Sequence, residues 1–548
     1  MHEFRAPPGS APVPHIPDDL TLSQFFLDFN HPSRPPRPQG VPWLIEDHSG
    51  RGITGDELRS RTTNLANALR LKWNIVEDDA VCIFSPNHVD YPVCIWAIHK
   101  LGAIVTPANP GYTADELVYQ IQTTKAKLLL VYADFLPTAL SAATQAGLSA
   151  DRNPCQTGGI WIPQTAKLFE RKLGPGEAKT KVAFYSFSSG TTGKPKAVVI
   201  PHYSFAANVL QTAAHYGIAD PSLKKKHMNP GDVAVAVVVL HYMLFSGLSL
   251  VVIPKFNFTE FLNSLVRHKI THLFLVPPQI VLLCKHPIVK NYDLSRVKFC
   301  ISGAAPMSAE LMKSVSKILP NAAIGQGYGM TETCTTVSLM GGKQKMGTPG
   351  SAGLLIPGVV TRVIRPDGSL CKEGEQGELV VTGPSMALGY LNNEQATKES
   401  FVDGWVKTGD EVIIRKSEVF VVDRLKEIIK VKGFQVAPAE LEGHLLLHPA
   451  VEDACVVGVP DEYSGEIPLA YIVVNAATLK RITANPSEAE KVKAALIKHV
   501  ADAKIAYKRL TGGVEFIDAI PKNPSGKILR RVLRDKAKQS HATLRAKM

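Results

Sequence analysis

The chain has few aromatic residues and few cysteines for a length of 548 residues. Aromatic residues make up 7 %, and the eight cysteines include no Cys-x-x-Cys pair. Thiols this sparse do not build a disulfide scaffold or a zinc site, so we expect a reducing compartment and no structural zinc. The sequence also lacks internal repeats and long low-complexity tracts, which excludes a solenoid and a largely disordered chain.

The chain has a single hydrophobic run long enough to cross a membrane, at Val233–Ile253. The run divides at His241 into a β-branched first part and a second part with small residues. This division is typical of a strand, a turn and a closely packed helix inside a core, so we expect no integral membrane span. The segment Met1–Pro17 is rich in proline and has no apolar core, and we therefore expect no secretory signal.

Positive charge exceeds negative charge, because 61 Lys and Arg residues against 49 Asp and Glu residues give a formal net charge of +12. This excess favours an anionic partner such as a nucleotide, a coenzyme or nucleic acid. The basic segment Arg530–Lys538 raises a nucleic-acid binder as an alternative. That segment has no interleaved aromatic residues and matches no known module, so we expect a basic enzyme without a nucleic-acid partner. Salt-sensitive binding to duplex DNA is the test of the alternative.

The order of apolar runs and helix starts predicts an α/β fold. Thr54 with Glu57, and Thr113 with Glu116, have capping-box spacing in front of helical patterns. Strands that end at glycine or proline and lead into helices predict mainly parallel sheets, layered with helices, whose carboxyl ends bind ligand. Runs typical of buried strands occur at 80–84, 128–131, 182–185, 270–276 and 297–302.

The chain divides into a large and a small domain, with a length typical of roughly three or four hydrophobic cores. From Gly347 to Val422, short β-branched runs are broken by glycine and proline, which predicts a small β-rich subdomain of the large domain. The charged segment Asp423–Lys426 then marks the boundary with a small α+β domain. We therefore place the domains at 1–422 and 423–548, with a strand at 451–459 and helices at 486–503 and from 528 in the second.

The strongest motif is a loop rich in hydroxyls and glycine at 188–196, directly after an apolar run. It reads Ser-Ser-Gly-Thr-Thr-Gly-Lys-Pro-Lys. The hydroxyls and glycines supply hydrogen-bond donors without bulk, and Lys194 and Lys196 add positive charge, which is typical of a phosphate site. A proline follows Lys194, and the glycine spacing of a Walker A loop is absent, so a P-loop NTPase is excluded.

A second motif at 325–332 reads Gly-Gln-Gly-Tyr-Gly-Met-Thr-Glu. Alternating glycines let the backbone lie flat against a planar ring, and Tyr328 offers a stacking surface. Thr331 and Glu332 carry the oxygen ligands that magnesium prefers. Further on, Asp410 follows a glycine turn and is placed to bind ribose hydroxyls, with Arg424 as a companion. Each of these features alone also fits an ordinary turn.

The small domain carries lysines beside glycines, at 430–435 and at 524–527. Most lysines are solvated surface charges, and that interpretation stays open for these residues. Lys527 lies on a Pro-Ser-Gly loop before a basic helix, where a mobile cation is placed to reach a phosphate.

These motifs occur together and in order, and from about Leu20 to Leu533 the sequence resembles the acyl-adenylate-forming superfamily. This superfamily contains acyl-CoA synthetases, beetle luciferases and peptide-synthetase adenylation domains, and the sequence is most similar to 4-coumarate:CoA ligases. The resemblance implies an ATP-dependent carboxylate:CoA ligase that uses ATP, magnesium and coenzyme A. A luciferase-type oxygenase and a free-standing adenylation domain that loads a carrier protein are the alternatives.

The resemblance also implies a role for individual residues. Lys527 would stabilise charge during adenylation, Lys430 would serve thioester formation, and a mobile small domain would pivot at Lys426. Glu332 would help to bind magnesium, and His241, Thr331 and Glu332 would take part in catalysis. Coenzyme A is expected at Lys432 and Gly433. ATP or AMP is expected at Ser188, Ser189, Gly190, Thr191, Thr192, Gly193, Lys196, Gln326, Gly327, Tyr328, Gly329, Thr331, Asp410, Arg424, Gln435 and Lys527.

The acyl pocket implied by the resemblance comprises His241, Met243, Gly247, Ala304, Gly327 and Met330. Met243 stands where the plant coumarate enzymes have an aromatic residue, and Gly247 where they have a small hydroxyl residue. These departures predict an aryl, phenylpropanoid-like or medium-chain acid rather than a polyhydroxylated one. Ala197 replaces a glycine that is common after the loop lysine, and we expect this change to be tolerated.

The last three residues, Ala546-Lys547-Met548, have the small, basic and aliphatic character of a peroxisomal import signal. We therefore expect a peroxisomal location, with the cytoplasm as the alternative. The expected partner is a small-molecule carboxylic acid, and the expected assembly is a monomer or a homodimer.

Overall fold

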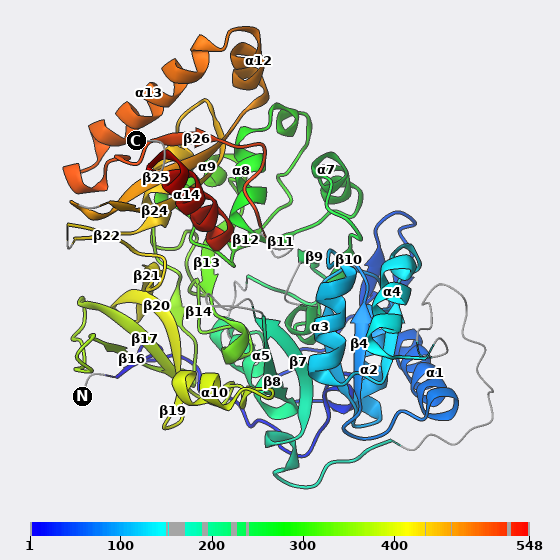
Figure 1. Ribbon diagram of the computed structural model, residues 1–548. Helices are drawn as coiled ribbons and strands as arrows, with labels where there is room; N and C mark the ends of the chain where they lie inside the picture. The colour runs from blue at the N-terminus through cyan, green and yellow to red at the C-terminus, as the bar shows by residue number, and fades with distance from the viewer. Residues whose placement is uncertain are drawn as a thin grey trace.

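The computed structural model describes residues 3–149, 152, 170–188, 195–220, 227–236, 240–432, 434–461, 463–522 and 528–545. The described strands form three sheets (Figure 1). Several predicted site residues lie outside the described residues, namely Ser189, Gly190, Thr191, Thr192, Gly193, Gly433, Lys527 and the tripeptide Ala546-Lys547-Met548.

The first sheet is parallel from β6 (Leu128–Val131) to β7 (Val182–Ser188), as predicted for the N-terminal part of the chain, and its last two strands, β8 (Lys196–Pro201) and β18 (Gly389–Tyr390), are antiparallel. Thr54 accepts a hydrogen bond from the Glu57 amide, and Thr113 and Glu116 form a complete capping box, so both predicted helix starts are confirmed. Figure 1 shows α1 (Gly55–Trp73), α2 (Tyr91–Lys100), α3 (Ala114–Thr124) and α4 (Leu136–Ala146) grouped around β4 (Ala80–Phe84). In spatial order the sheet contains β18 (Gly389–Tyr390), β8 (Lys196–Pro201), β7 (Val182–Ser188), β5 (Ile104–Ala108), β4 (Ala80–Phe84) and β6 (Leu128–Val131), with α1 (Gly55–Trp73), α2 (Tyr91–Lys100), α3 (Ala114–Thr124), α4 (Leu136–Ala146) and α5 (His202–Tyr216) as helices of this region.

The second sheet joins a parallel half to an antiparallel half. Because the parallel strands run in one direction, their carboxyl ends meet at one edge, where ligands bind in such sheets. The parallel half contains β2 (Leu44–Glu46), β10 (Ser249–Val252), β9 (Val233–Ala236), β11 (His272–Leu275), β12 (Phe299–Ser302) and β13 (Ala323–Tyr328), with β3 (Gly52–Ile53) antiparallel at its edge and α7 (Phe258–Arg267), α8 (Pro277–Lys285) and α9 (Ala309–Ile318) as helices.

The antiparallel half confirms the β-rich character predicted between Gly347 and Val422. Its strands are hydrogen-bonded to the parallel half through the pair β13–β14, so the two halves form one continuous sheet. Its elements are β14 (Ser338–Leu339), β15 (Leu354–Leu355), β21 (Glu418–Arg424), β20 (Trp405–Arg415), β17 (Gln376–Thr382), β16 (Val360–Ile364), β1 (Phe4–Arg5), β19 (Phe401–Val402) and α10 (Glu394–Ser400).

The run Val233–Ile253 differs in part from the sequence prediction. Strand β9 and helix α6 (Leu240–Phe245) follow the expected order, but a second strand, β10, replaces the rest of the expected helix. Gly247 has a φ of +83°, a left-handed conformation that ends the helix and turns the chain into β10. Within the part of the chain that the structure describes, no helix has both the length and the apolarity needed to cross a bilayer.

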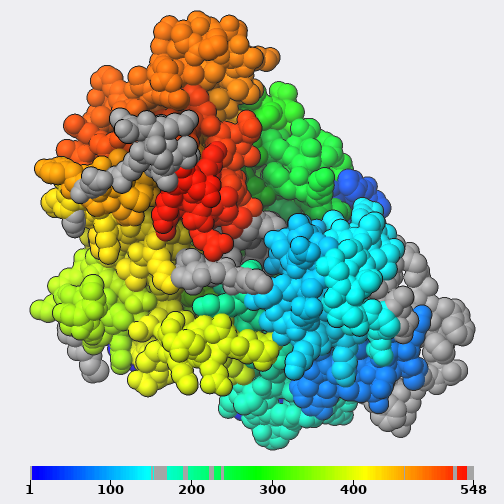
Figure 2. Space-filling view, in the orientation of Figure 1, coloured from blue at the N-terminus to red at the C-terminus, as the bar shows by residue number. Residues whose placement is uncertain are grey.

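The small domain contains the third sheet, and Figure 2 shows it, in orange and red, above the yellow and green parts of the large domain. Strand β21 ends at Arg424 and β22 begins at Ile429, so the predicted boundary at Asp423–Lys426 overlaps the end of β21. Asp423 and Arg424 therefore lie in the sheet of the large domain, and the small domain begins after them. The predicted strand and both predicted helices are present. The elements are β22 (Ile429–Val431), β23 (Phe434–Val436), α11 (Pro438–Leu445), β24 (Val451–Asp461), β25 (Gly465–Val474), α12 (Ala476–Ala484), α13 (Ser487–Ala503), β26 (Val514–Phe516) and α14 (Arg530–Arg545).

The basic segment at the start of α14 is in part an internal structural element. The Arg530 side chain is buried and binds the Glu427 carboxylate at 3.0 Å, the carbonyl oxygen of Val456 at 2.8 Å and the Glu442 carboxylate. These partners hold the guanidinium inside the small domain. Arg530 is therefore not part of a surface for nucleic acid, which weakens the alternative that the segment raised.

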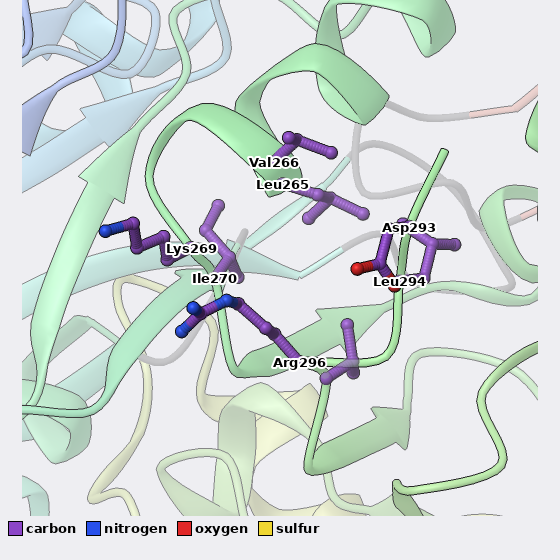
Figure 3. Close-up of a pocket in the computed structure, with 8 residues that line it drawn as sticks. Leu265, Val266, Lys269, Ile270, Asp293, Leu294 and Arg296 are labelled. Atoms are coloured by element: carbon purple, nitrogen blue, oxygen red, sulfur yellow. The ribbon is translucent and has the colours of Figure 1, made fainter. Parts of the chain in front are cut away.

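One small hollow of about 220 Å³ lies between the end of α7 and the loop before β12 (Figure 3). Its lining includes Ile270, just before β11, and Val297, just before β12. Both residues precede parallel strands, so the hollow lies at the amino ends of these strands, opposite the edge where ligands bind in such sheets. It is separate from the candidate site.

Candidate active site

Tyr328, Asp410 and Arg424 form one hydrogen-bonded corner at the junction of the two sheet halves. The Tyr328 hydroxyl donates to Asp410 Oδ2 at 2.7 Å, and Arg424 Nε lies 3.4 Å from Asp410 Oδ1. Asp410 and Arg424 are register partners on β20 and β21, which fixes them side by side. Burial and the neighbouring Asp410 carboxylate raise the pKa of Tyr328, so its hydroxyl keeps its proton and donates. The predicted ribose residues are thus brought together with the predicted stacking residue.

A second cluster of side chains links Lys196, at the end of the phosphate loop, to Glu332, the predicted magnesium ligand. Ser188 and Lys196 are register partners at the facing ends of β7 and β8, and they flank the loop at 189–194. Lys196 Nζ lies 4.9 Å from the centre of the Tyr390 ring. The Tyr390 hydroxyl donates to Glu332 Oε1 at 2.8 Å. The sequence analysis missed Tyr390, because only the pairing of β18 with β8 brings this distant residue to the loop.

Glu332 has the chemistry that a magnesium ion requires. Its side chain is 3 % exposed, and its Oε2 has no hydrogen-bond partner within the described ranges. A buried carboxylate oxygen without a partner is costly, because it has lost its water without replacement. Magnesium binds carboxylate oxygens together with substrate phosphates, so Glu332 fits the role that the sequence predicted.

The glycines of the 325–332 motif are explained by close packing within the protein. A Cβ at Gly325 would lie 2.5 Å from the Met340 side chain, and one at Gly327 would lie 2.6 Å from Leu339. At Gly329 it would meet the carbonyl oxygen of Thr335. Strand β13 thus needs glycine to let its neighbours approach, whatever ligand lies at its edge.

The side chain of Gln326 holds the backbone near the carboxyl end of β13 in place. Its amide nitrogen donates to the carbonyl oxygens of Met307 and Ser351, both at 3.1 Å, and its oxygen accepts from the Met307 amide at 2.6 Å. The two bonds with Met307 fix the loop after β12 to β13, and the bond to Ser351 fixes the segment before β15. In this arrangement Gln326 positions the backbone around the site. Thr331 and Glu332 then follow on a single 3-10 turn, Thr331–Thr333.

His241 lies at the start of α6 in an aromatic environment. The rings of Phe26, Phe205 and Trp96 have centres 4.7, 4.9 and 5.9 Å from its ring. Its Nε2 has no hydrogen-bond partner in the part of the chain described. Burial lowers the pKa of His241 to about 3, so the imidazole is neutral at physiological pH. A neutral ring among aromatic residues is suited to binding beside an acyl group, and not to supplying positive charge.

The other predicted pocket residues fall into two sets. Met243 is fully buried in the large hydrophobic core, and a Cβ at Gly247 would lie 3.0 Å from Pro230. Packing therefore accounts for the absence of a side chain at Gly247, a reason that the sequence alone did not give. Ala304 and Met330 follow the carboxyl ends of β12 and β13, and Ala304 has a φ of +69°. That left-handed conformation is strained for alanine, and such strain occurs at functional sites.

Lys430 and Gln435 lie opposite each other on the hairpin of β22 and β23. The end of the Gln435 side-chain amide lies 3.2 Å from the Glu411 carboxylate, and with its nitrogen oriented toward this acceptor the amide donates to Glu411. Neighbouring residues of a strand point to opposite faces, so this contact is on the face of β20 opposite Asp410. The structure therefore does not bring Lys430 or Gln435 to the corner of Asp410 and Tyr328. Lys426 is exposed in the turn between the domains.

Lys432 lies at the tip of the same hairpin beside a residue that the sequence analysis missed. Its Nζ is 4.3 Å from the centre of the Tyr463 ring. Tyr463 is 83 % exposed, so one face of its ring is open to solvent. The ring and the lysine together offer a stacking surface and a cation.

Ala197, the departure after the loop lysine, is accommodated without strain in the backbone. The residue is buried in β8, and its carbonyl oxygen accepts from the Leu391 amide at 2.8 Å. Its methyl group is buried in the protein interior.

Comparisons with known proteins identify the family of the chain. The model of the AMP-binding enzyme family matches residues 35–391, and that of the AMP-binding enzyme C-terminal domain matches residues 440–527. The chain is 34 % identical to 4-coumarate–CoA ligase 3 of Arabidopsis thaliana over 90 % of this chain and 88 % of the relative. It is 30 % identical to the acyl-CoA ligase easD of Emericella nidulans over 97 % and 99 % of the two chains.

Solved structures show the same fold. The anthranilate CoA ligase AuaEII, in complex with anthranoyl-AMP, superposes with a TM-score of 0.81 at 22 % identity, covering 96 % of this chain and 99 % of that chain. The ATP-bound MatB from Rhodopseudomonas palustris superposes with a TM-score of 0.76 at 25 % identity, covering 94 % and 99 %. The matched family models and the 34 % identity over most of both chains show that this chain belongs to the AMP-binding enzyme family.

Proposed function

We propose that the protein is an ATP-dependent ligase that joins an aryl, phenylpropanoid-like or medium-chain carboxylic acid to coenzyme A through an acyl-adenylate. One observation carries the proposal. The segment 328–332 connects the ribose corner, at Tyr328, to the metal and phosphate group, at Glu332, within five residues. The end of strand β13 and the turn that follows it thus carry groups for both the ribose and the phosphates of an adenosine phosphate.

The first half-reaction uses the groups at the carboxyl edge of the sheet. Asp410 accepts hydrogen bonds from the ribose, while Lys196 and the loop at 189–194 hold the phosphates. The substrate carboxylate attacks the α-phosphorus, the bond to pyrophosphate breaks, and the product is a mixed anhydride of the acid with AMP. Glu332 would hold a magnesium ion, which neutralises phosphate charge when bound. Lys527 would supply a further cation at the α-phosphate.

The second half-reaction needs different groups at the same carbonyl carbon. The thiol sulfur of coenzyme A attacks that carbon, AMP leaves with the electron pair of the broken bond, and the thiol proton is released. Lys430 and Lys432 lie on the hairpin of β22 and β23, which faces away from Asp410, and Tyr463 lies beside Lys432 in the turn between β24 and β25. A rotation of the small domain about Lys426 would bring the hairpin to the site after adenylation.

The class of acid follows from the surroundings of His241. Phe26, Phe205 and Trp96 enclose the imidazole, and burial keeps it neutral. These apolar surfaces favour an aryl or aliphatic group and provide no partner for a second charge.

A panel of carboxylic acids tests the function. Cinnamates, benzoates, phenylacetate and medium-chain fatty acids are incubated with ATP, and pyrophosphate and thioester are measured with and without coenzyme A. We expect an aryl or medium-chain acid to give the highest kcat/KM, and coenzyme A to convert the product from acyl-adenylate to thioester. A best substrate such as acetate or an amino acid would contradict the acid class. A product that coenzyme A never changes would contradict the ligase assignment and favour the oxygenase or carrier-loading alternatives.

The ribose corner gives a separate prediction. Asp410→Ala removes the acceptor of the Tyr328 hydrogen bond and the partner of Arg424. We expect the KM for ATP to rise by about tenfold or more, because buried hydrogen bonds to a charged group are commonly worth about 1.5–3 kcal/mol. Tyr328→Phe, which removes only one hydroxyl, should have a smaller effect. An unchanged KM for ATP in Asp410→Ala would exclude this carboxylate from nucleotide binding.

A further inference from the structure

Helix α11 of the small domain is held at its amino end by the large domain. Asp423, on β21, is buried, and its Oδ2 accepts a hydrogen bond from the Ala439 amide at 3.1 Å. Ala439 is the second residue of α11, so Asp423 satisfies one of the free amides of this helix end. The contact joins the two sides of the turn at Lys426. Burial raises the pKa of Asp423 to about 6, so the carboxyl group is mainly ionised at pH 7.5.

The carboxyl end of α11 is held by a second residue of the large domain. Lys285, the last residue of α8, donates from Nζ to the carbonyl oxygen of Leu446 at 2.6 Å and to that of Val451 at 2.8 Å. Leu446 is the C-cap of α11. An anion at the amino end and a cation at the carboxyl end both complement the helix dipole.

The middle of α11 packs closely against the large domain. A Cβ built at Gly443 would lie 3.2 Å from Ser308 Cβ. Ser308 is the N-cap of α9, so two helices of different domains meet at this point. The large domain therefore contacts α11 at its start, centre and end, and it does so through β21, α8 and α9.

We propose that α11 is the docking helix of the small domain, and that Asp423, Lys285 and the Ser308–Gly443 contact together hold the domains in the arrangement that forms the acyl-adenylate. This inference rests on the proposed function. The arrangement is assigned to adenylation because Lys430, expected to serve thioester formation, lies on a hairpin that faces away from Asp410. Rotation about Lys426 must break all three contacts. Their strength therefore sets how much of the protein is in the adenylating arrangement and how much is in the arrangement that forms the thioester. These side chains are positioning residues and touch no substrate.

A cross-link between Ser308 and Gly443 tests the inference directly. The Cβ separation of 3.2 Å is close to the 3.5–4.5 Å of disulfides, so the double variant Ser308→Cys, Gly443→Cys should oxidise with little movement. We expect the oxidised enzyme to form acyl-adenylate and pyrophosphate at a rate within about threefold of the reduced enzyme. Thioester formation from supplied acyl-adenylate should fall at least about a hundredfold and return on reduction.

The controls separate the cross-link from other effects. The single variants Ser308→Cys and Gly443→Cys, treated with the same oxidant, report the loss of the N-cap hydroxyl and any reaction of native thiols. Mass spectrometry measures the cross-link. A cross-linked enzyme that makes thioester at the reduced rate would overturn the inference, and so would a failure of the pair to cross-link. A reduced enzyme that forms no acyl-adenylate from any acid of the panel would instead overturn the proposed function.

Lys285→Met provides a second test that does not depend on a cross-link. Loss of the ammonium leaves the carbonyl oxygens of Leu446 and Val451 without this donor, so the adenylating arrangement should become less populated. We expect acyl-adenylate formation to slow by about three- to tenfold, with no decrease in thioester formation from supplied acyl-adenylate. Lys290→Met, an exposed lysine five residues along the chain, is the matched control. Equal losses in both half-reactions, or none, would contradict the inference.

Discussion

Lys527→Ala is expected to lower the rate of acyl-adenylate formation by about a hundredfold or more, because a cation that stabilises developing charge in a dry site commonly contributes this much. The variant should still convert supplied acyl-adenylate to thioester, since phosphorus is no longer attacked in that step. Single-turnover release of pyrophosphate measures the first half-reaction. Thioester formed from synthetic acyl-adenylate measures the second.

Lys430→Ala should show the converse pattern. Lys430 is exposed on the hairpin of β22 and β23, on the side away from Asp410, so its loss should leave adenylation nearly unchanged. Thioester formation should fall by a comparable factor. Lys480→Ala, an exposed lysine on α12, controls for the loss of positive charge in the small domain. If each variant slows both half-reactions equally, Lys527 and Lys430 do not serve separate half-reactions.

Much of the fold was predictable because its determinants are local. The helix starts at Thr54 and Thr113 depend on side chains three residues apart, and the structure shows these hydrogen bonds. Short apolar runs identified β4, β6 and β12, and the last of these runs ends before Gly303. The motifs around Tyr328 and Asp410 were also visible, since each is a continuous stretch of sequence.

The rest depends on contacts between distant parts of the chain. Residues 249–252 form a strand between β2 and β9, which Val251 and Val252 favour as β-branched residues. The small residues Ser246, Gly247 and Ser249 led the sequence analysis to a helix instead. Tyr390 joins Glu332 only through the pairing of β18 with β8. Lys285, an ordinary helix-terminal lysine in the sequence, meets the small domain about 160 residues away. Such pairings have no local pattern, so sequence reasoning did not find these residues.

Glu332→Gln is expected to lower acyl-adenylate formation by about a hundredfold and to weaken its dependence on magnesium. The substitution keeps the shape of the side chain and an oxygen that can accept from the Tyr390 hydroxyl, now 2.8 Å from Oε1. It removes the negative charge and one carboxylate oxygen, which is what a magnesium ion bound to phosphates needs most. The rate of pyrophosphate release as a function of magnesium concentration is the measurement. A magnesium dependence like that of the wild type would exclude Glu332 as a ligand.

The stability of the same variant distinguishes a ligand from a structural residue. Glu332 is buried, and its Oε2 has no hydrogen-bond partner among the described residues, so the unliganded protein bears the cost of a desolvated charge. Glu332→Gln should therefore leave the Tm of the unliganded protein equal or raise it, while activity falls. Tyr390→Phe keeps a ring beside Lys196 but removes the hydroxyl that orients Glu332, and it should cost only about tenfold in adenylation. A fall in Tm for Glu332→Gln that matches the loss of activity would show that the carboxylate maintains the fold and does not hold a metal.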